Sequence, residues 1–270
     1  MRALITGASS GIGKEISYEL AKRKIDLCLV ARRYERLLEI KNDIELKFGV
    51  NVEIYGKDLS KEKDVFSLCE ETGKVDILVN NAGFGKIGNF IETSLNDELE
   101  IIDVNVKALH ILTKKYIEKM DGEGYILNVA SIAAFMPGGP LLSSYYASKA
   151  YVLSLSQSIN EELKCLGKNI SVSTLCPGPV NTEFNSVAGV KFNLNSLTAQ
   201  KVARIAVKKM FKRKRTIIPG LTIKFSQFAQ RIIPTFIMLK ITHKMQKKKV
   251  WKEDLILWVK KAKQNLKKIL

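Results

Sequence analysis

Cysteine and histidine are scarce in this chain of 270 residues. The cysteines stand far apart with no paired spacing; they are Cys28, Cys69, Cys165 and Cys176. That pattern favours buried thiols in a reducing compartment over disulfide bonds or a zinc site. The two histidines, His110 and His243, have no acidic or sulfur-bearing neighbour at ligand spacing. We therefore expect no metal site and a cytoplasmic protein.

A signal peptide and a membrane-spanning helix are not expected either. The strand-like residues Ala3 to Ile5 follow the initiator almost at once, which leaves no room for a secretory signal. Apolar residues are frequent in 221–241, but Lys224 and Arg231 interrupt them and Pro234 breaks the helical pattern. No repeat and no linker rich in proline or glycine marks a second domain.

Acidic residues are nearly missing from the last part of the chain. Residues 201–270 hold 21 Lys and Arg but only 2 Asp and Glu, whereas the first 200 residues hold 23 and 25. A nearly neutral body therefore precedes a strongly basic C-terminal part. Such an asymmetry indicates an anionic surface as partner, or a specialised appendage.

Short apolar runs alternate with longer helical patterns through the first 180 residues. This alternation predicts an α/β fold, with a parallel sheet between helices. Strands are expected at 2–6, 25–31, 51–55, 75–80, 124–130 and 169–176, with a seventh at 216–218. The run Ile77 to Val79 lacks polar alternation, as expected for a strand buried on both faces.

A pair of residues, Tyr145 and Lys149, lies in a helix predicted over 144–166. Residues four apart share one helix face, so the phenol and the ammonium can serve one site. A nearby ammonium lowers the pKa of a phenol and makes it usable for proton transfer to a carbonyl oxygen. Taken alone, this spacing is common, and the rest of the chain has to support it.

A glycine-rich loop follows the first strand and opens a helix that runs to about Lys24. Glycines allow a tight turn and a close approach to a pyrophosphate, and the helix N-terminus adds free N–H groups. The loop is not a Walker loop, because Lys14 is followed by Glu15. The residues expected to contact the phosphates are Gly7, Ser9, Ser10, Gly11, Ile12 and Gly13.

The end of the second strand bears on which dinucleotide binds. An acidic residue near this position selects NAD through the ribose 2′-hydroxyl, whereas arginine suits a 2′-phosphate. Here Arg32 and Arg33 follow the strand, and no acidic residue occurs before Glu35. We predict that NADP(H) is preferred over NAD(H), with Arg32 as the main contact.

Further motifs occur in order along the chain. Lys57 to Ser60, Asn80 to Gly83 and Pro177 to Thr182 follow the third, fourth and sixth strands, Asn128 to Ser131 ends the fifth strand, and Asp103 to Val106 lies in a predicted helix. Together with the glycine loop and the Tyr145/Lys149 pair, this series resembles the short-chain dehydrogenase/reductase family, in its shorter single-domain branch. The resemblance covers about residues 1–220. It implies a Rossmann-type doubly wound sheet of about seven strands in the order 3-2-1-4-5-6-7, and a homo-oligomer, either dimer or tetramer.

The resemblance also implies roles for individual residues. Tyr145 would donate the proton to the substrate oxygen, and Lys149 would hold the nicotinamide ribose and lower the tyrosine pKa. Ser131 would polarise the substrate carbonyl, and Asn105 would hold a water that connects Lys149 to solvent. The implied cofactor contacts elsewhere are Asp58 and Leu59 at the adenine, Asn81, Ala82 and Gly83 at the adenosine ribose, and Pro177, Gly178, Val180 and Thr182 at the nicotinamide and its phosphate.

The chain departs from the family pattern between Ser131 and Tyr145. The interval is about one residue longer, with Gly138 to Pro140 as the apparent insertion. This leaves open that Ser143 or Ser144 enters the site. The adjacent Tyr146 has no lysine four residues on and is assigned to packing.

The C-terminal part, 221–270, is expected to extend the catalytic domain of 1–220. Residues 221–241 are interpreted as an apolar flap over the active site, or alternatively as an interfacial segment that draws lipid-like substrates from a membrane. Residues 247–270 form a basic amphipathic pattern that includes Trp251 and Trp258. This helix suits an anionic membrane surface, and equally its own domain or a second subunit. Nucleic acid is not expected, because no base-reading module is present.

These patterns predict an NADP(H)-dependent oxidoreductase that interconverts a carbonyl and an alcohol, on an apolar substrate such as an acyl, steroid or lipid-like ketone. One alternative is a non-catalytic nucleotide-sensing or membrane-associated scaffold protein on the same fold. Another is a sugar-nucleotide epimerase or dehydratase of the longer branch. The spacing Gly7-x-x-x-Gly11-x-Gly13 and the short C-terminal part argue against the latter.

Overall fold

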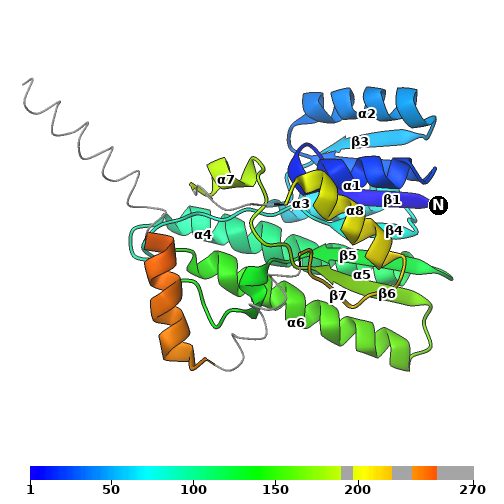
Figure 1. The fold of residues 1–270 in the computed structure, drawn as a ribbon. Helices are drawn as coiled ribbons and strands as arrows, with labels where there is room; N and C mark the ends of the chain where they lie inside the picture. Colours follow the sequence, from blue (N-terminus) through cyan, green and yellow to red (C-terminus); the bar gives the residue numbers. More distant parts are fainter. Residues whose placement is uncertain (190–196, 221–232, 248–270) are drawn as a thin grey trace, which may run out of the picture.

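A seven-stranded parallel sheet forms the centre of the molecule (Figure 1). The computed structural model describes residues 1–189, 197–220 and 233–247. The strand order β3-β2-β1-β4-β5-β6-β7 confirms the predicted fold class and topology. The strands are β1 (Arg2–Thr6), β2 (Asp26–Ala31), β3 (Val52–Gly56), β4 (Ile77–Asn80), β5 (Gly124–Val129), β6 (Ile170–Leu175) and β7 (Thr216–Ile217).

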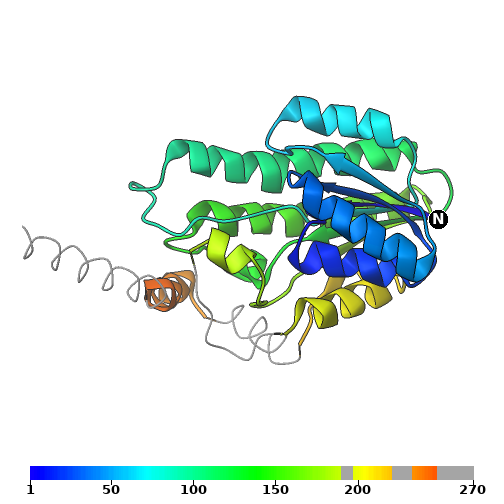
Figure 2. The same cartoon turned by 90° about the horizontal axis from the view of Figure 1, so that it is seen from above.

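Helices cover both faces of the sheet, and they lie on opposite sides of it in Figure 2. One face packs against α1 (Gly11–Ala21), α2 (Tyr34–Phe48) and α8 (Ala199–Met210). The other packs against α3 (Glu62–Thr72), α5 (Leu109–Lys119) and α6 (Ser143–Cys165). β4, β5 and β6 are buried along their whole length, which explains why the run Ile77 to Val79 in β4 shows no polar alternation.

The carboxyl ends of the parallel strands meet at one edge of the sheet. Chain order reverses between the neighbours β1 and β4, and such a switch point is where open α/β sheets bind ligands. The short helices α4 (Leu95–Ile102) and α7 (Phe184–Val187), and a helix over 235–247, lie at this end of the molecule in both views. The loops expected to carry the site therefore converge there.

The helix expected around Asp103 to Val106 has an unusual form. A π-helical turn, Asp103–Ala108, joins α4 to α5 and contains the buried Asn105. Wide turns of this kind often occur at functional sites, because they displace one side chain from the regular helical path. A shorter 3₁₀ turn, Ile132–Phe135, follows β5, and the Ser131 hydroxyl caps it by accepting a hydrogen bond from Ala133 N at 3.2 Å.

The C-terminal extension is described over 233–247. Pro234 directly precedes the helix over 235–247, a position where its missing N–H costs nothing. This helix buries Met238, Thr242 and Gln246. The rest of the predicted flap, 221–232, and nearly all of the predicted amphipathic helix, 248–270, lie outside the described residues. Within the described parts, no helix has the length and apolar character needed to cross a bilayer.

Candidate active site

Helix α6 carries the predicted catalytic pair at the carboxyl edge of the sheet. Tyr145 and Lys149 share one face of the helix, and the Lys149 Nζ lies 5.8 Å from the centre of the Tyr145 ring. The lysine is 4% exposed and donates a hydrogen bond of 2.9 Å to the carbonyl oxygen of Val129, the last residue of β5. The ammonium is therefore held between the helix and the sheet, next to the phenol.

Ser131 joins this pair from the end of β5. Its side chain lies close enough to Tyr145 to lower the pKa of the phenol. Neither alternative serine takes this place, because Ser144 donates to the Glu98 carboxylate and Ser143 is exposed. The longer interval before Tyr145 thus leaves Ser131 as the serine beside the tyrosine.

Burial dominates the pKa of both members of this pair. It raises the pKa of Tyr145 to about 12, and Ser131 opposes that rise only in part. Burial lowers the pKa of Lys149 to about 8. The lowering of the tyrosine pKa by the ammonium stays a prediction.

Asn105 connects the π-helical turn to the catalytic helix. Its side-chain Nδ2 donates to Phe84 O at 2.9 Å and to Ser148 Oγ at 3.0 Å, and its Oδ1 accepts from Phe84 N at 3.0 Å. Ser148 in turn donates to the carbonyl oxygen of Tyr145 at 2.7 Å. This chain of contacts ties Asn105 to the backbone of the tyrosine. The predicted water relay through Asn105 stays a prediction.

The glycine loop is shaped by the segment that follows β4. Asn81 Nδ2 donates to the carbonyl oxygens of Thr6 and Gly7 at 3.0 and 3.2 Å. A Cβ at Gly7 would lie 2.8 Å from that nitrogen, and one at Gly13 would lie 2.4 Å from Gly7 O. The loop is therefore too tight for a side chain at Gly7 or Gly13. Asn81 acts as its brace, a role that the sequence did not indicate.

This cradle fits the pyrophosphate of a dinucleotide. Gly7 and Gly11 have positive φ angles of 65° and 55°, and α1 begins at Gly11 without a side-chain cap on its first N–H groups. Unpaired N–H groups at a helix start favour an anion. The methyl group of Thr182 would lie 3.2 Å from a Cβ at Gly11, so the segment after β6 closes over the same loop.

The two arginines after β2 take different positions. Arg32, the expected 2′-phosphate contact, pairs with Glu100 at 3.1 Å. Arg33 instead lies against the glycine loop: its Nε and Nη2 donate to Ser9 Oγ at 3.2 and 2.9 Å, and its Nη2 donates to Ser10 Oγ at 3.0 Å. Arg33 is the arginine that joins the predicted phosphate-binding serines.

The remaining predicted cofactor residues surround the same edge. Asp58 accepts hydrogen bonds from the backbone and the hydroxyl of Ser60 at 3.2 and 2.8 Å, and Leu59 is buried. Pro177 O accepts from Ile132 N at 3.0 Å, which joins the segment after β6 to the turn that begins at Ser131.

Gly83 lies beside the catalytic lysine. A Cβ at Gly83 would lie 3.2 Å from Lys149 Nζ. The segment after β4 therefore runs from the glycine loop to the catalytic pair, which agrees with a cofactor lying along this edge. The predicted contacts of Ala82, Gly178 and Val180 with a cofactor remain predictions.

Two residues beside Tyr145 were not among the predicted site residues. The Phe184 ring lies 5.4 Å from the Tyr145 ring at an interplanar angle of 49°. A Cβ at Gly85 would lie 3.0 Å from the Tyr145 ring. Both positions stand close to predicted motifs, after Thr182 and Gly83, but an isolated aromatic or glycine in a loop gives no signal of its own.

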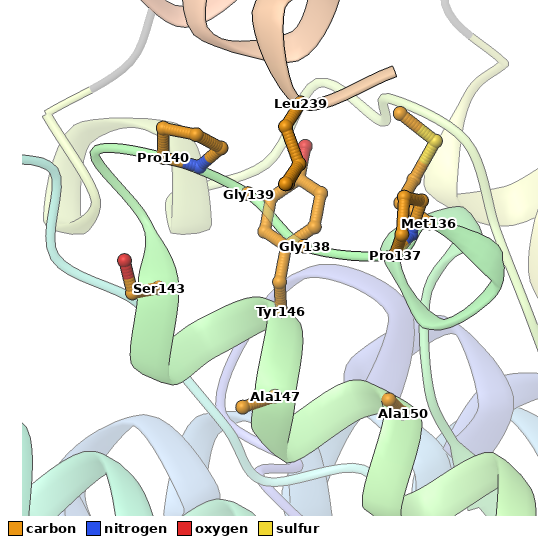
Figure 3. A pocket seen from close by; sticks show the side chains of 10 residues that line it. All are labelled: Met136, Pro137, Gly138, Gly139, Pro140, Ser143, Tyr146, Ala147, Ala150 and Leu239. Carbon is orange, nitrogen blue, oxygen red and sulfur yellow. The ribbon is translucent and has the colours of Figure 1, made fainter. Parts of the chain in front are cut away.

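Tyr146 lines a cavity of about 340 Å³ (Figure 3). The cavity lies between Met136 to Pro140, the helix α6 and Leu239. The Tyr146 hydroxyl accepts a hydrogen bond of 2.7 Å from Gln246 Nε2. Its packing role is thus to attach the helix over 235–247 to the catalytic helix.

Comparisons with known proteins agree with this geometry. The sequence profile for the short chain dehydrogenase family matches residues 1–191. Human 17-beta-hydroxysteroid dehydrogenase type 3 is 37% identical over 67% of this chain, and the match spans only 59% of that relative. A short-chain dehydrogenase from Sphingobium yanoikuyae in complex with NADPH aligns with a TM-score of 0.78 and 32% identity, covering 84% of this chain and 91% of that one. A relative from Burkholderia phymatum in complex with NAD aligns with a TM-score of 0.76 and 26% identity, with the same coverages.

Proposed function

The chain belongs to the short-chain dehydrogenase/reductase family, and from this premise we propose that it uses NADP(H) to interconvert a ketone or aldehyde and its alcohol. One observation carries the proposal. Ser131 lies close enough to Tyr145 to lower the pKa of its phenol, and the buried Lys149 stands beside the same ring. These groups come from a strand end and a helix face, next to a glycine cradle that fits a pyrophosphate.

Each side chain has a defined task in carbonyl reduction. The pKa of Tyr145, raised to about 12, keeps its hydroxyl protonated near neutral pH, so it can donate a proton to the substrate oxygen. Ser131 donates a hydrogen bond to the same oxygen and stabilises the charge that develops there. Lys149 binds the ribose hydroxyls and supports reprotonation of the tyrosine. The bound nicotinamide would supply the hydride.

The preference for NADP(H) rests on Arg33 rather than on Arg32 alone. A guanidinium that already contacts Ser9 and Ser10 is placed to form paired hydrogen bonds with a 2′-phosphate. Arg33→Ala should weaken NADPH binding at least tenfold and NADH binding much less, with Arg32→Ala as the matched comparison. Isothermal titration measures both. Equal losses for the two cofactors would defeat the assignment.

An apolar substrate is supported by the surroundings of the tyrosine. The Phe184 ring stands 5.4 Å from the Tyr145 ring. The human relative is a hydroxysteroid dehydrogenase by name, so ketosteroids are the first compounds to screen, with acyl ketones and simple aldehydes beside them. The substrate that this chain turns over is the one whose addition causes steady loss of NADPH absorbance.

Replacing Tyr145 by Phe tests the catalytic assignment directly. The variant should lose about a thousandfold or more in turnover, because the proton donor is removed, while NADPH still binds. Turnover that is unchanged would rule out Tyr145 as the acid. A wild-type protein that binds NADPH and reduces none of these carbonyl compounds would instead favour the non-catalytic scaffold.

We also propose that the protein works in the cytoplasm, at an anionic membrane surface. The outward side of the helix over 235–247 exposes Phe236, Ile241 and Met245 beside Lys240 and Lys244. Apolar side chains flanked by lysines suit the interface of an anionic bilayer.

Vesicle sedimentation tests this attachment. Binding to vesicles that contain phosphatidylserine should fall when Ile241 and Met245 are replaced by Glu. Leu46→Glu is the matched control, because Leu46 is 87% exposed on α2, away from this helix. Deleting residues 247–270 tests the remainder of the basic segment. Equal binding of neutral and anionic vesicles would contradict the proposal.

A homo-oligomer is proposed from an exposed apolar line on α4. Leu95, Leu99 and Ile102 are exposed at steps of four and three, so they share one face of the helix. Light scattering should give a dimer or tetramer that Leu99→Lys converts to smaller species. Leu46→Lys is the control, and a monomeric wild-type protein would contradict this proposal.

A further inference from the structure

Glu183 connects two regions that are far apart in the sequence. It follows Thr182 in the segment after β6, and its carboxylate accepts from Arg33 Nη1 at 2.7 Å and from Arg36 Nη1. Arg33 precedes α2 and Arg36 lies in its first turn. The pair of contacts therefore joins the loop beside β2 to the segment beside β6.

Arg33 contacts two segments of the chain at once. Its Nε and Nη2 contact the hydroxyls of Ser9 and Ser10 in the glycine loop, while its Nη1 contacts Glu183. Since Thr182 also lies over Gly11, Glu183 holds the segment after β6 across the glycine loop. A 2′-phosphate bound by Arg33 would lie close to this carboxylate.

Glu183 carries a negative charge, as a bound phosphate would. Hydrogen bonds from Arg36 and Arg33 lower the pKa of Glu183 to about 2, so the carboxylate is charged throughout the physiological range. Its side chain is 43% exposed, and the ion pairs are therefore screened and individually weak. A phosphate dianion carries more charge and more acceptor oxygens, and it can take over the same arginines.

We propose that Glu183 is a specificity-determining residue, whose carboxylate competes with the cofactor 2′-phosphate for Arg33 and Arg36. This inference rests on the proposed use of NADP(H). Binding of NADP(H) breaks the Glu183 contacts and releases the segment after β6 from the glycine loop. NAD(H), which has a 2′-hydroxyl in place of the phosphate, leaves the contacts in place.

Glu183→Gln tests the competition. The variant should bind NADPH and the probe 2′,5′-ADP about threefold to tenfold more tightly, because two screened ion pairs no longer have to be broken. NADH affinity should change by less than about twofold. Glu35→Gln is the matched control, since Glu35 is exposed beside both arginines and pairs with neither within the described residues.

Three results of the titrations would overturn the proposal. One is weaker NADPH binding in Glu183→Gln, which would make Glu183 a residue that positions the arginines. Another is an equal gain for NADPH and NADH, and the third is an equal gain in the Glu35→Gln control.

The cofactor preference of the wild type, measured beside that of Glu183→Gln, separates the inference from the proposed function. A wild-type protein that binds NADH as tightly as NADPH would defeat the proposed cofactor preference, and this inference with it. A wild-type preference for NADPH that Glu183→Gln leaves unchanged would defeat the inference alone. Without cofactor, Glu183→Gln should also exchange the amide hydrogens of 184–188 faster than the wild type, and an unchanged rate would show that Glu183 does not hold this segment.

Discussion

Replacing Lys149 by Met should inactivate the protein and at the same time remove a destabilising charge. Lys149 is 4% exposed, and burial lowers its pKa from 10.5 to about 8. A lysine whose pKa is lowered in the folded state costs stability wherever both states are protonated, which is below about pH 8. That cost declines as the pH rises from about 8 to about 10.5, where the unfolded chain also loses its proton.

The size of the effect follows from the shift. At about 1.4 kcal/mol for each pH unit, a change from 10.5 to about 8 corresponds to about 3 kcal/mol near pH 7. Methionine at this position cannot donate the hydrogen bond to Val129 O, and this loss destabilises the variant by about 1 kcal/mol or more at every pH. The change of this stability difference with pH therefore reports on the buried charge alone. Relative to that of Lys149→Met, the free energy of unfolding of the wild type should rise by about 2 kcal/mol between about pH 7 and about pH 10.

Urea unfolding at these two pH values measures the difference. Lys164→Met is the control, because Lys164 is in the same helix with its side chain 69% exposed. The difference in free energy of unfolding between Lys164→Met and the wild type should be the same at both pH values. Turnover of Lys149→Met should fall about a thousandfold, since the tyrosine loses its partner. If the difference in free energy of unfolding between Lys149→Met and the wild type does not change with pH, the reasoning about the buried charge is refuted.

Three smaller changes test the packing of the site. Gly85→Ala should lower turnover about tenfold with little loss of cofactor affinity, because its Cβ would lie 3.0 Å from the Tyr145 ring; wild-type turnover would show that the ring can move aside. Ser148→Ala removes the hydroxyl that links the π-helical turn to the catalytic helix. It should shift the pH profile of turnover as well as reduce stability by about 1 kcal/mol, and a loss of stability alone would mean a merely structural role. Tyr146→Phe removes the hydroxyl that accepts from Gln246 and should cost about 1 kcal/mol in thermal unfolding with turnover retained, whereas loss of turnover would place Tyr146 in the site.

Local patterns in the sequence were enough to predict the sheet. The strands lie within two residues of their expected positions. An apolar run without alternation, such as Ile77 to Val79, can be satisfied only by burial on both faces. The helix spacing of Tyr145 and Lys149 placed both on one face for a similarly local reason. The glycine loop was predictable because its backbone requires glycine at Gly7 and Gly13.

Contacts between distant segments were not predictable from the sequence. Arg32 and Arg33 are adjacent, and only the path of the chain after β2 decides that Arg33 reaches Ser9. Glu183 lies 150 residues from Arg33, and no local pattern relates the two.

Burial at the site was likewise decided by the fold. The spacing of Tyr145 and Lys149 brought a base near an acid, but it did not reveal how far the fold desolvates each of them. That desolvation raises the pKa of the tyrosine and lowers that of the lysine. The sequence by itself therefore indicated the catalytic pair and the glycine loop. The tertiary structure decided their charge states and their partners, because both depend on groups that only folding brings within a few ångströms.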